Sequence, residues 1–191
     1  MALTRTALWH AGGSLGAWAE TASRGLLREQ ARRWRHVCGV AAQARRIAAI
    51  LDEWDRPYLE AAAYLHDVGY SEALRRCGAH QLDGARFLRE SGEERLARLV
   101  AHHSEARHLL QLTGLGTELE LYPPEVSAVA DALTYCDLTT GPDGQRTTPS
   151  ERMAEVDQRY GGGSVIVQAQ ELARPALMEA VARTEERLQL P

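Results

Sequence analysis

The chain has 191 residues, of which 45% are apolar and 25% are charged, and this balance is typical of one globular domain with a full core. Its formal net charge of −4 excludes a general positive field that would hold nucleic acid or an anionic membrane surface. The 22 basic residues are all arginines, so chemistry that needs a lysine, such as a Schiff base or the P-loop phosphate contact, is also excluded.

The cysteines and the apolar stretches narrow the class of protein further. Cys38, Cys77 and Cys136 lie far apart and form no Cys-x-x-Cys pair, so we expect reduced thiols rather than a zinc ribbon or a redox dithiol. Polar residues break the apolar stretches well before the ~20 positions that a transmembrane helix needs, so none is expected. Because residues 1–18 lack the pattern of a secretory signal, the cytoplasm is the expected location.

The composition predicts an all-α fold, because alanine and leucine dominate and phenylalanine occurs only once. Residues 1–20 are expected to be an N-terminal segment that packs on the domain. Trp9 and Trp18 in this segment would pack across the domain or form a partner surface, and a homo-oligomer is left open.

Helical patterns then follow one another along the chain. Small and apolar residues recur at three- and four-residue spacing from residue 31 to residue 51, which predicts an amphipathic helix. Pro57 suits the first turn of a second helix, which ends near His66 before Gly69. Further helices are predicted over residues 81–90, 93–102 and 125–140.

Glycine and proline residues mark the helix boundaries that are predicted in the last quarter of the chain. After a loop at residues 141–144, the run Thr148-Pro149-Ser150-Glu151 is typical of a capping box and predicts a helix to Tyr160. Three glycines end that helix, and Pro175 is expected to separate two more. These two helices are expected over residues 165–172 and 176–188. For the domain organisation, we expect residues 21–148 to form the main domain and residues 149–191 to be C-terminal helices that complete it.

Polar side chains suited to metal binding lie on the apolar faces of these predicted helices. His36 and His66 each lie on an apolar stripe, and Asp67 follows His66 directly at a helix end. Asp137 also lies on an apolar face, whereas Asp131 lies off that face and is expected to be solvated. A lone inward histidine is usually a hydrogen-bonded core residue, but the His-Asp doublet brings an imidazole and a carboxylate to one point.

Three motifs in this order resemble the HD-domain superfamily of metal-dependent phosphohydrolases. They are Arg-Trp-Arg-His36, Ala-Ala-Tyr-Leu-His66-Asp67-Val-Gly69 and Leu-Thr-Tyr-Cys-Asp137-Leu-Thr. The stretches His80-Gln-Leu-Asp-Gly-Ala-Arg-Phe-Leu and Leu-Val-Ala-His-His103 are also similar to it, so the resemblance covers roughly residues 30 to 140. It implies a single-domain helical HD-domain bundle.

The resemblance also implies a metal site, with one ion bound by His36, His66, Asp67 and Asp137. In the dinuclear branch of the family a second ion is bound, here by His80 and His103 with Asp67 as the bridge. Imidazole and carboxylate ligands without thiolate favour divalent Fe or Mn, with Co, Ni or Zn as further options. Two such ions can activate a hydroxide at neutral pH and neutralise the charge of a phosphoryl group. As ligands of these ions, His66 and Asp67 are the expected catalytic residues.

Two further residues are candidate substrate contacts. His102 would lie about 100° around the helix from His103, and Arg107 would lie on the metal-facing side if the helix continues through Ser104. The fork of an arginine suits a phosphate or a carboxylate. Ordinary surface roles stay open for these residues and for His80, which follows a turn.

The leading interpretation is a metal-dependent phosphohydrolase that cleaves a phosphate ester of a small metabolite or nucleotide with a metal-activated hydroxide. One alternative is a mixed-valent di-iron oxygenase of the same superfamily acting on a phosphonate, whose members carry a Tyr and Glu pair ahead of the first His. Here Glu29 fits, but Leu26 stands near the partner position. Another alternative is a non-catalytic ligand-binding domain with the HD fold.

Two features of the sequence bear on the substrate. Many family members carry a lysine shortly after the His-Asp doublet, whereas this chain has Tyr70 there. The arginines from Arg24 to Arg46 are spread around their helix in a net acidic chain, so we expect a solvated surface and no nucleic acid as the main partner. A membrane partner is not expected either.

Overall fold

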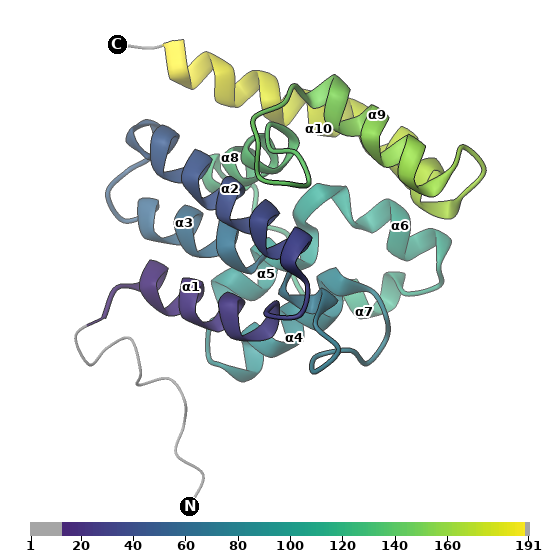
Figure 1. Ribbon diagram of the computed structural model, residues 1–191, viewed down its shortest axis with the longest axis horizontal. Helices are drawn as coiled ribbons and strands as arrows, with labels where there is room; N and C mark the ends of the chain where they lie inside the picture. Colours follow the sequence, from purple (N-terminus) through teal and green to yellow (C-terminus); the bar gives the residue numbers. More distant parts are fainter. Residues whose placement is uncertain (1–12, 190–191) are drawn as a thin grey trace, which may run out of the picture.

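α-Helices of 5 to 25 residues make up the computed structural model of the protein, which describes residues 13–189 (Figure 1). The helices are α1 (Leu15–Leu26), α2 (Ala31–Ile47), α3 (Arg56–Leu65), α4 (His80–Glu90), α5 (Glu94–His102), α6 (Arg107–Leu112), α7 (Gly116–Glu120), α8 (Ala128–Leu138), α9 (Pro149–Tyr160) and α10 (Val165–Gln189). Within the described residues there is no β-strand, only an isolated bridge between Thr140 and Arg146. The predicted all-α fold is therefore confirmed.

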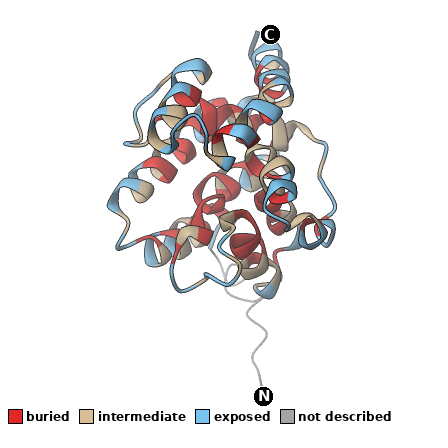
Figure 2. Cartoon of the chain, turned by 90° about the vertical axis from the view of Figure 1, so that its right-hand side faces the viewer, coloured by how far each residue is buried: buried red, intermediate tan, exposed pale blue. Residues whose placement is uncertain are grey.

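The helices pack around one apolar core. Helix α3 lies between α1 and α2 and also contacts α5 and α8, while α4 packs along α5 and α10 packs on α6 and α8. In Figure 1, α9 and α10 lie together across one side of the bundle. Figure 2 shows the buried residues gathered on the inner faces of the helices, with the exposed residues outside. Leu59, Leu65, Leu82, Val100 and Leu133 are among the buried core residues.

The predicted stripe of α2 is buried as expected, with Val37, Val40, Ala44 and Ile47 all in the core. The α-helix ends at Ile47, and a 3-10 turn over residues 48–50 continues it almost to the predicted end. The stripe is buried because α2 packs against α3 and α8.

The N-terminal boundary differs from the expected one at residue 20, because α1 crosses this position without a break and packs against α3. The side chain of Ser14 accepts a hydrogen bond from the N–H of Ala17 and caps the helix. Trp18 is half-buried and packs against the core, whereas Trp9 lies outside the described residues. Residues 15–26 are therefore part of the bundle.

The expected break at Pro175 is wrong, because α10 runs unbroken for 25 residues with Pro175 inside it. Ala173, Leu177 and Val181 bury one face of this helix on both sides of the proline. Packing against α6 and α8 therefore outweighs the cost of a proline within a helix. None of the described helices, α10 included, is long and apolar enough to cross a membrane.

The expectation that Asp131 is solvated is also wrong. Its side chain in α8 is only 12% exposed and accepts hydrogen bonds from Arg183 at 2.7 Å and Arg187 at 2.9 Å. Both arginines belong to α10, so this ion-pair cluster fastens the C-terminal helix to the rest of the bundle. The sequence period placed Asp131 off the inner face, but it did not show that α10 would cover that side.

Candidate metal centre

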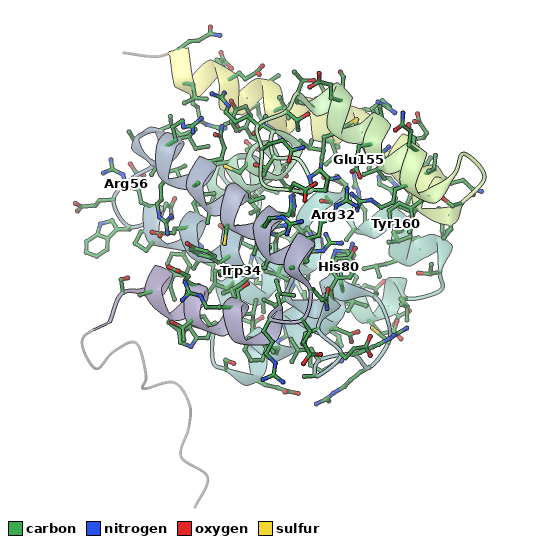
Figure 3. All side chains as sticks on the ribbon, viewed as in Figure 1. Arg32, Trp34, Arg56, His80, Glu155 and Tyr160 are labelled. Atoms are coloured by element: carbon green, nitrogen blue, oxygen red, sulfur yellow. The ribbon has the colours of Figure 1, made fainter. Side chains whose placement is uncertain are left out.

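The structure brings together four histidines and two aspartates that come from separate elements. They are His36 in α2, His66 and Asp67 at the end of α3, His80 at the start of α4, His103 after α5 and Asp137 in α8. All except His80 are buried. His80, the first residue of α4, is labelled in Figure 3.

Asp67 lies between two pairs of imidazoles. Its Oδ2 atom is 3.4 Å from Nε2 of His66 and 3.9 Å from Nε2 of His36. Its Oδ1 atom is 3.5 Å from Nε2 of His80 and 3.8 Å from Nε2 of His103. Each carboxylate oxygen of Asp67 therefore faces its own histidine pair.

Asp137 completes the first of these groups. Its Oδ1 atom lies 3.1 Å from Nε2 of His36, and its Oδ2 atom accepts a hydrogen bond of 2.9 Å from the hydroxyl of Ser104. The guanidinium of Arg152 lies 3.8 Å from Oδ1. The carboxylate is therefore held in place from three sides.

The orientation of the histidines suits metal binding. Nδ1 of His36, His66 and His103 is hydrogen-bonded to the backbone carbonyls of Gly141, Ala63 and Val100, at 3.1, 2.9 and 2.6 Å. With the proton on Nδ1, the Nε2 lone pair is free toward the centre of the cluster.

The lack of a hydrogen bond at Nε2 of His66 indicates that these residues fit a metal ion. This atom is buried and makes no hydrogen bond. An unpaired buried polar atom costs about 1–3 kcal/mol, which a coordinated cation would offset. Two groups, His36 with His66 and Asp67, and Asp67 with His80 and His103, also bring their ligand atoms within 4.8 Å of one another. The donor set therefore fits divalent metal ions.

Close backbone approaches hold these elements together. A Cβ at Gly69 would collide with the carbonyl of His80, so only glycine lets the turn after Asp67 lie against the start of α4. A Cβ at Gly39 would lie 2.6 Å from the Cα of Gly144, where α2 meets the loop after α8. These two contacts bring the histidines of α2 and α4 to the same centre.

Burial and charge shape the titration of the cluster. Burial raises the pKa of Asp67, but Arg33 and His66 outweigh it and hold this pKa well below its usual range. Burial also opposes ionisation of Asp137, and His36, His66 and Arg152 together lower its pKa instead. Both carboxylates are therefore ionised at neutral pH.

The pKa shifts of His66, His80 and His103 differ in direction. Burial lowers the pKa of His80 and of His103, and their positively charged neighbours lower it further. Burial also opposes protonation of His66, but Asp67 outweighs it and raises the pKa of His66. His80 and His103 are therefore neutral near pH 7, as a ligand must be.

A pocket of about 350 Å³ opens onto the cluster at Asp67, His80, His103 and Asp137. Arg33, Arg152 and Arg159 line one side of it. These three arginine side chains are only 18%, 10% and 24% exposed. Arg33 is paired with Asp67, and Arg152 and Arg159 are both paired with Glu155. The pocket thus combines buried carboxylates and imidazoles with arginines that are held in place and whose remaining donors suit an anion.

Arg33 and Tyr70 form the edge of this pocket next to Asp67. Arg33 donates a hydrogen bond of 2.6 Å to Oδ2 of Asp67, and its guanidinium lies 3.9 Å from the centre of the Tyr70 ring. The Tyr70 ring in turn stacks on His80, with ring centres 4.0 Å apart. This stack fixes three side chains against the carboxylate.

A protein-family model described as HD domain matches residues 33–138. The chain belongs to the HD domain family. The matched range contains all six side chains of the cluster, and the family comprises metal-dependent hydrolases in general. Neither the curated proteins nor the solved structures include a significant match to the chain.

Two predicted substrate contacts of this HD domain lie away from the metal-ligand cluster. The ring of His102 faces the carbonyl of Tyr122 at 2.5 Å, and Arg107 is 55% exposed and paired with Glu105 at 2.8 Å. Ser104 and Glu105 have φ of 55° and 53°, so the helix does not continue through them as the prediction for Arg107 requires. Both residues line a neighbouring pocket instead.

Several residues at the HD site were not expected from the sequence. Arg33 was placed among solvated arginines, and this is wrong because it contacts Asp67. Arg33 lies three residues before His36, so both side chains share one helix face. This spacing in the sequence already indicated that Arg33 lies near the metal-ligand cluster. Ser104, Arg152 and Arg159 gave no such signal, because only the tertiary fold brings them to the pocket.

Proposed function

We propose that the protein is a metal-dependent phosphohydrolase that cleaves a phosphate ester of a small metabolite or nucleotide. The observation that carries this proposal is the position of the Asp67 carboxylate. Each of its two oxygens faces a different pair of histidines, and the carboxylate lines a pocket that arginines also line. Metal ligands and buried cations that converge on one space suit an anionic substrate that is attacked by water.

The six residues of the cluster would hold two divalent ions. One ion would be held by His36, His66, Asp67 and Asp137, and the other by His80, His103 and Asp67. Bound divalent ions supply a water of lowered pKa and neutralise charge that develops on the phosphoryl group. Fe and Mn suit this donor set best.

The chain's own residues would bind and orient the substrate. Arg152 and Arg159 extend from α9 over the cluster, where their guanidinium groups would donate hydrogen bonds to phosphoryl oxygens. Arg33 is held beside Asp67 and Tyr70, so its charge is fixed before the substrate arrives. Such preorganised donors stabilise developing negative charge without having to reorient during the reaction.

The first test measures metal content and hydrolysis in the same preparation. We expect about two ions per chain and release of phosphate from at least one member of a panel of nucleotides and sugar phosphates. Asp67→Asn removes the bridging charge and should lower both metal content and the rate, the latter by at least about 100-fold. Asp131→Asn is the matched control, since it removes another arginine-paired carboxylate outside the pocket and should keep both.

Other outcomes would contradict the proposal. Oxygen uptake with a phosphonate by the ferrous protein, without phosphate-ester hydrolysis, would make it an oxygenase. No present observation favours that reaction, because Glu29 is 82% exposed and pairs with Arg28 on the surface. A protein that binds no metal and hydrolyses nothing would be a ligand-binding domain instead.

A further inference from the structure

The pocket above the metal-ligand cluster is lined by both cationic and apolar side chains. The cationic wall consists of Arg33, Arg152 and Arg159. The same pocket is also lined by apolar side chains, here called the apolar wall: Leu109, Leu138, Val156, Ile166, Ala169 and Leu177. Val156 lies between Arg152 and Arg159 on α9, so the two kinds of side chain meet there. Hydroxyl groups of a ligand that lay against the apolar wall would lose hydrogen bonds to water.

The apolar wall comes mostly from outside the family match, which ends at residue 138. Val156 belongs to α9, and Ile166, Ala169 and Leu177 belong to α10. The metal-ligand cluster lies wholly within the matched range, so the two parts have different origins in the sequence. This separation is typical of a common reactive centre combined with a specificity element of the individual protein.

Little polar surface interrupts this wall. Gln170 is the polar side chain that α10 contributes to the pocket, and its amide nitrogen is bonded to the carbonyl of Met153 and to Asp157 at 3.2 and 2.7 Å. Its donor is therefore engaged within the protein. Tyr160, which lines the pocket and is labelled in Figure 3, adds an aromatic ring at the end of α9.

The size of the pocket limits what it can hold. Its volume of about 350 Å³ lies at the lower end of the roughly 300–1,000 Å³ that is usual for small-molecule pockets. Such a pocket has room for a phosphoryl head and a small hydrocarbon body.

We propose that this pocket selects an amphiphilic phosphate monoester, with the anionic head at the arginines and a compact hydrocarbon body against the apolar wall. The identity of the substrate as an ester rests on the proposed function, whereas the pairing of anion and apolar body rests on the two walls. Burial of each methylene against the wall should strengthen binding until the wall is full.

A series of straight-chain alkylphosphonates from methyl to octyl tests the pocket by binding alone. Calorimetry with the metal-loaded protein should show the Kd falling about two- to fourfold per methylene and then levelling within the series, once the apolar wall is covered. A Kd that does not change along the series would overturn the inference. Matched alkyl phosphates then report hydrolysis: a Kd that falls with chain length, without any phosphate release, would contradict the phosphohydrolase and keep the two-walled pocket.

Two neighbouring substitutions localise the effect to the apolar wall. Ile166→Ser places a hydroxyl in the wall, while Val165→Ser changes a similar side chain on the same turn that is 38% exposed and outside the lining. We expect Ile166→Ser to weaken hexylphosphonate at least fivefold and to leave methylphosphonate unchanged, and Val165→Ser to change neither. Equal weakening of both ligands by Ile166→Ser would contradict the proposal, as would no weakening by either Ile166→Ser or Leu109→Ser.

Discussion

Asp67 shows how one residue can serve several partners. It ends the helix that carries His66, and a 3-10 turn over Val68–Tyr70 follows it directly. Its two oxygens face different imidazoles, and Arg33 binds one of them at 2.6 Å. A buried carboxylate is costly unless charges and hydrogen bonds surround it. The same neighbours that offset its burial therefore also build the site.

Ser104 is a positioning residue whose backbone conformation and side chain can be tested separately. Its φ of 55° and ψ of 29° lie in the left-handed region, where a non-glycine residue costs roughly 1 kcal/mol. Its hydroxyl binds Asp137. We expect Ser104→Ala and Ser104→Gly to weaken metal binding about tenfold alike, because both lose the hydroxyl.

Thermal stability should distinguish these two variants of Ser104. Glycine adopts the left-handed conformation freely, so Ser104→Gly should unfold at a higher temperature than Ser104→Ala. Metal titration and calorimetric unfolding of both variants make the comparison. If both bound metal as tightly as the parent protein, Ser104 would have no positioning role.

Helix α10 contains a proline, the residue least favourable to an α-helix, although it lines the pocket and packs against the rest of the bundle. Pro175 has no N–H and so leaves the carbonyl of Glu171 without its helical donor. Even so, α10 contributes to the apolar wall on both sides of Pro175 and carries the ion pairs with Asp131 after it. The contacts with α6 and α8 hold both halves in line.

Replacing this proline should therefore stabilise the protein. Pro175→Ala restores the donor at an exposed position, and we expect the free energy of unfolding to rise by roughly 1 to 2 kcal/mol. Pro175→Gly restores the same donor but carries a poor helix former, so it should gain about 1 kcal/mol less. Urea unfolding measures all three proteins; an unchanged or lower stability of Pro175→Ala would contradict the argument.

A helix could be predicted from the sequence wherever neighbouring residues alone determine it. The stripe of α2 and the capping box of Thr148 and Glu151 required only neighbouring residues, and both form as predicted. The course of α10 through Pro175 and the break at Ser104 depend on distant contacts, which no local pattern contains. The six residues of the cluster could be named from motifs, but the arginines of α9 could not.

At the scale of the whole molecule, the metal-ligand cluster is part of the core. His36, His66, Asp67 and His103 are each at most 6% exposed and lie among apolar residues. Ligands that bind only the folded protein stabilise it by mass action. The same residues that would carry the reaction therefore also link the stability of the fold to metal.

Removal of metal should lower the unfolding temperature. At a free metal concentration of about 100 times Kd, binding adds about 2.7 kcal/mol, which corresponds to roughly 5 to 10 °C for a chain of this length. Calorimetry of the metal-loaded protein with and without a chelator checks this shift. Asp67→Asn should show little or no shift; an equal shift in this variant would locate the stabilising ion elsewhere.

The contact between His36 and Asp137 joins positions 101 residues apart. During synthesis, the first of these side chains leaves the ribosome long before the second, and α8 must still find its place against α2 and α3. A chain that ends before α8 therefore lacks Asp137, although Asp67, His80 and His103 are already present. Closure of the group around His36 thus requires that elements from distant parts of the sequence have reached their native arrangement.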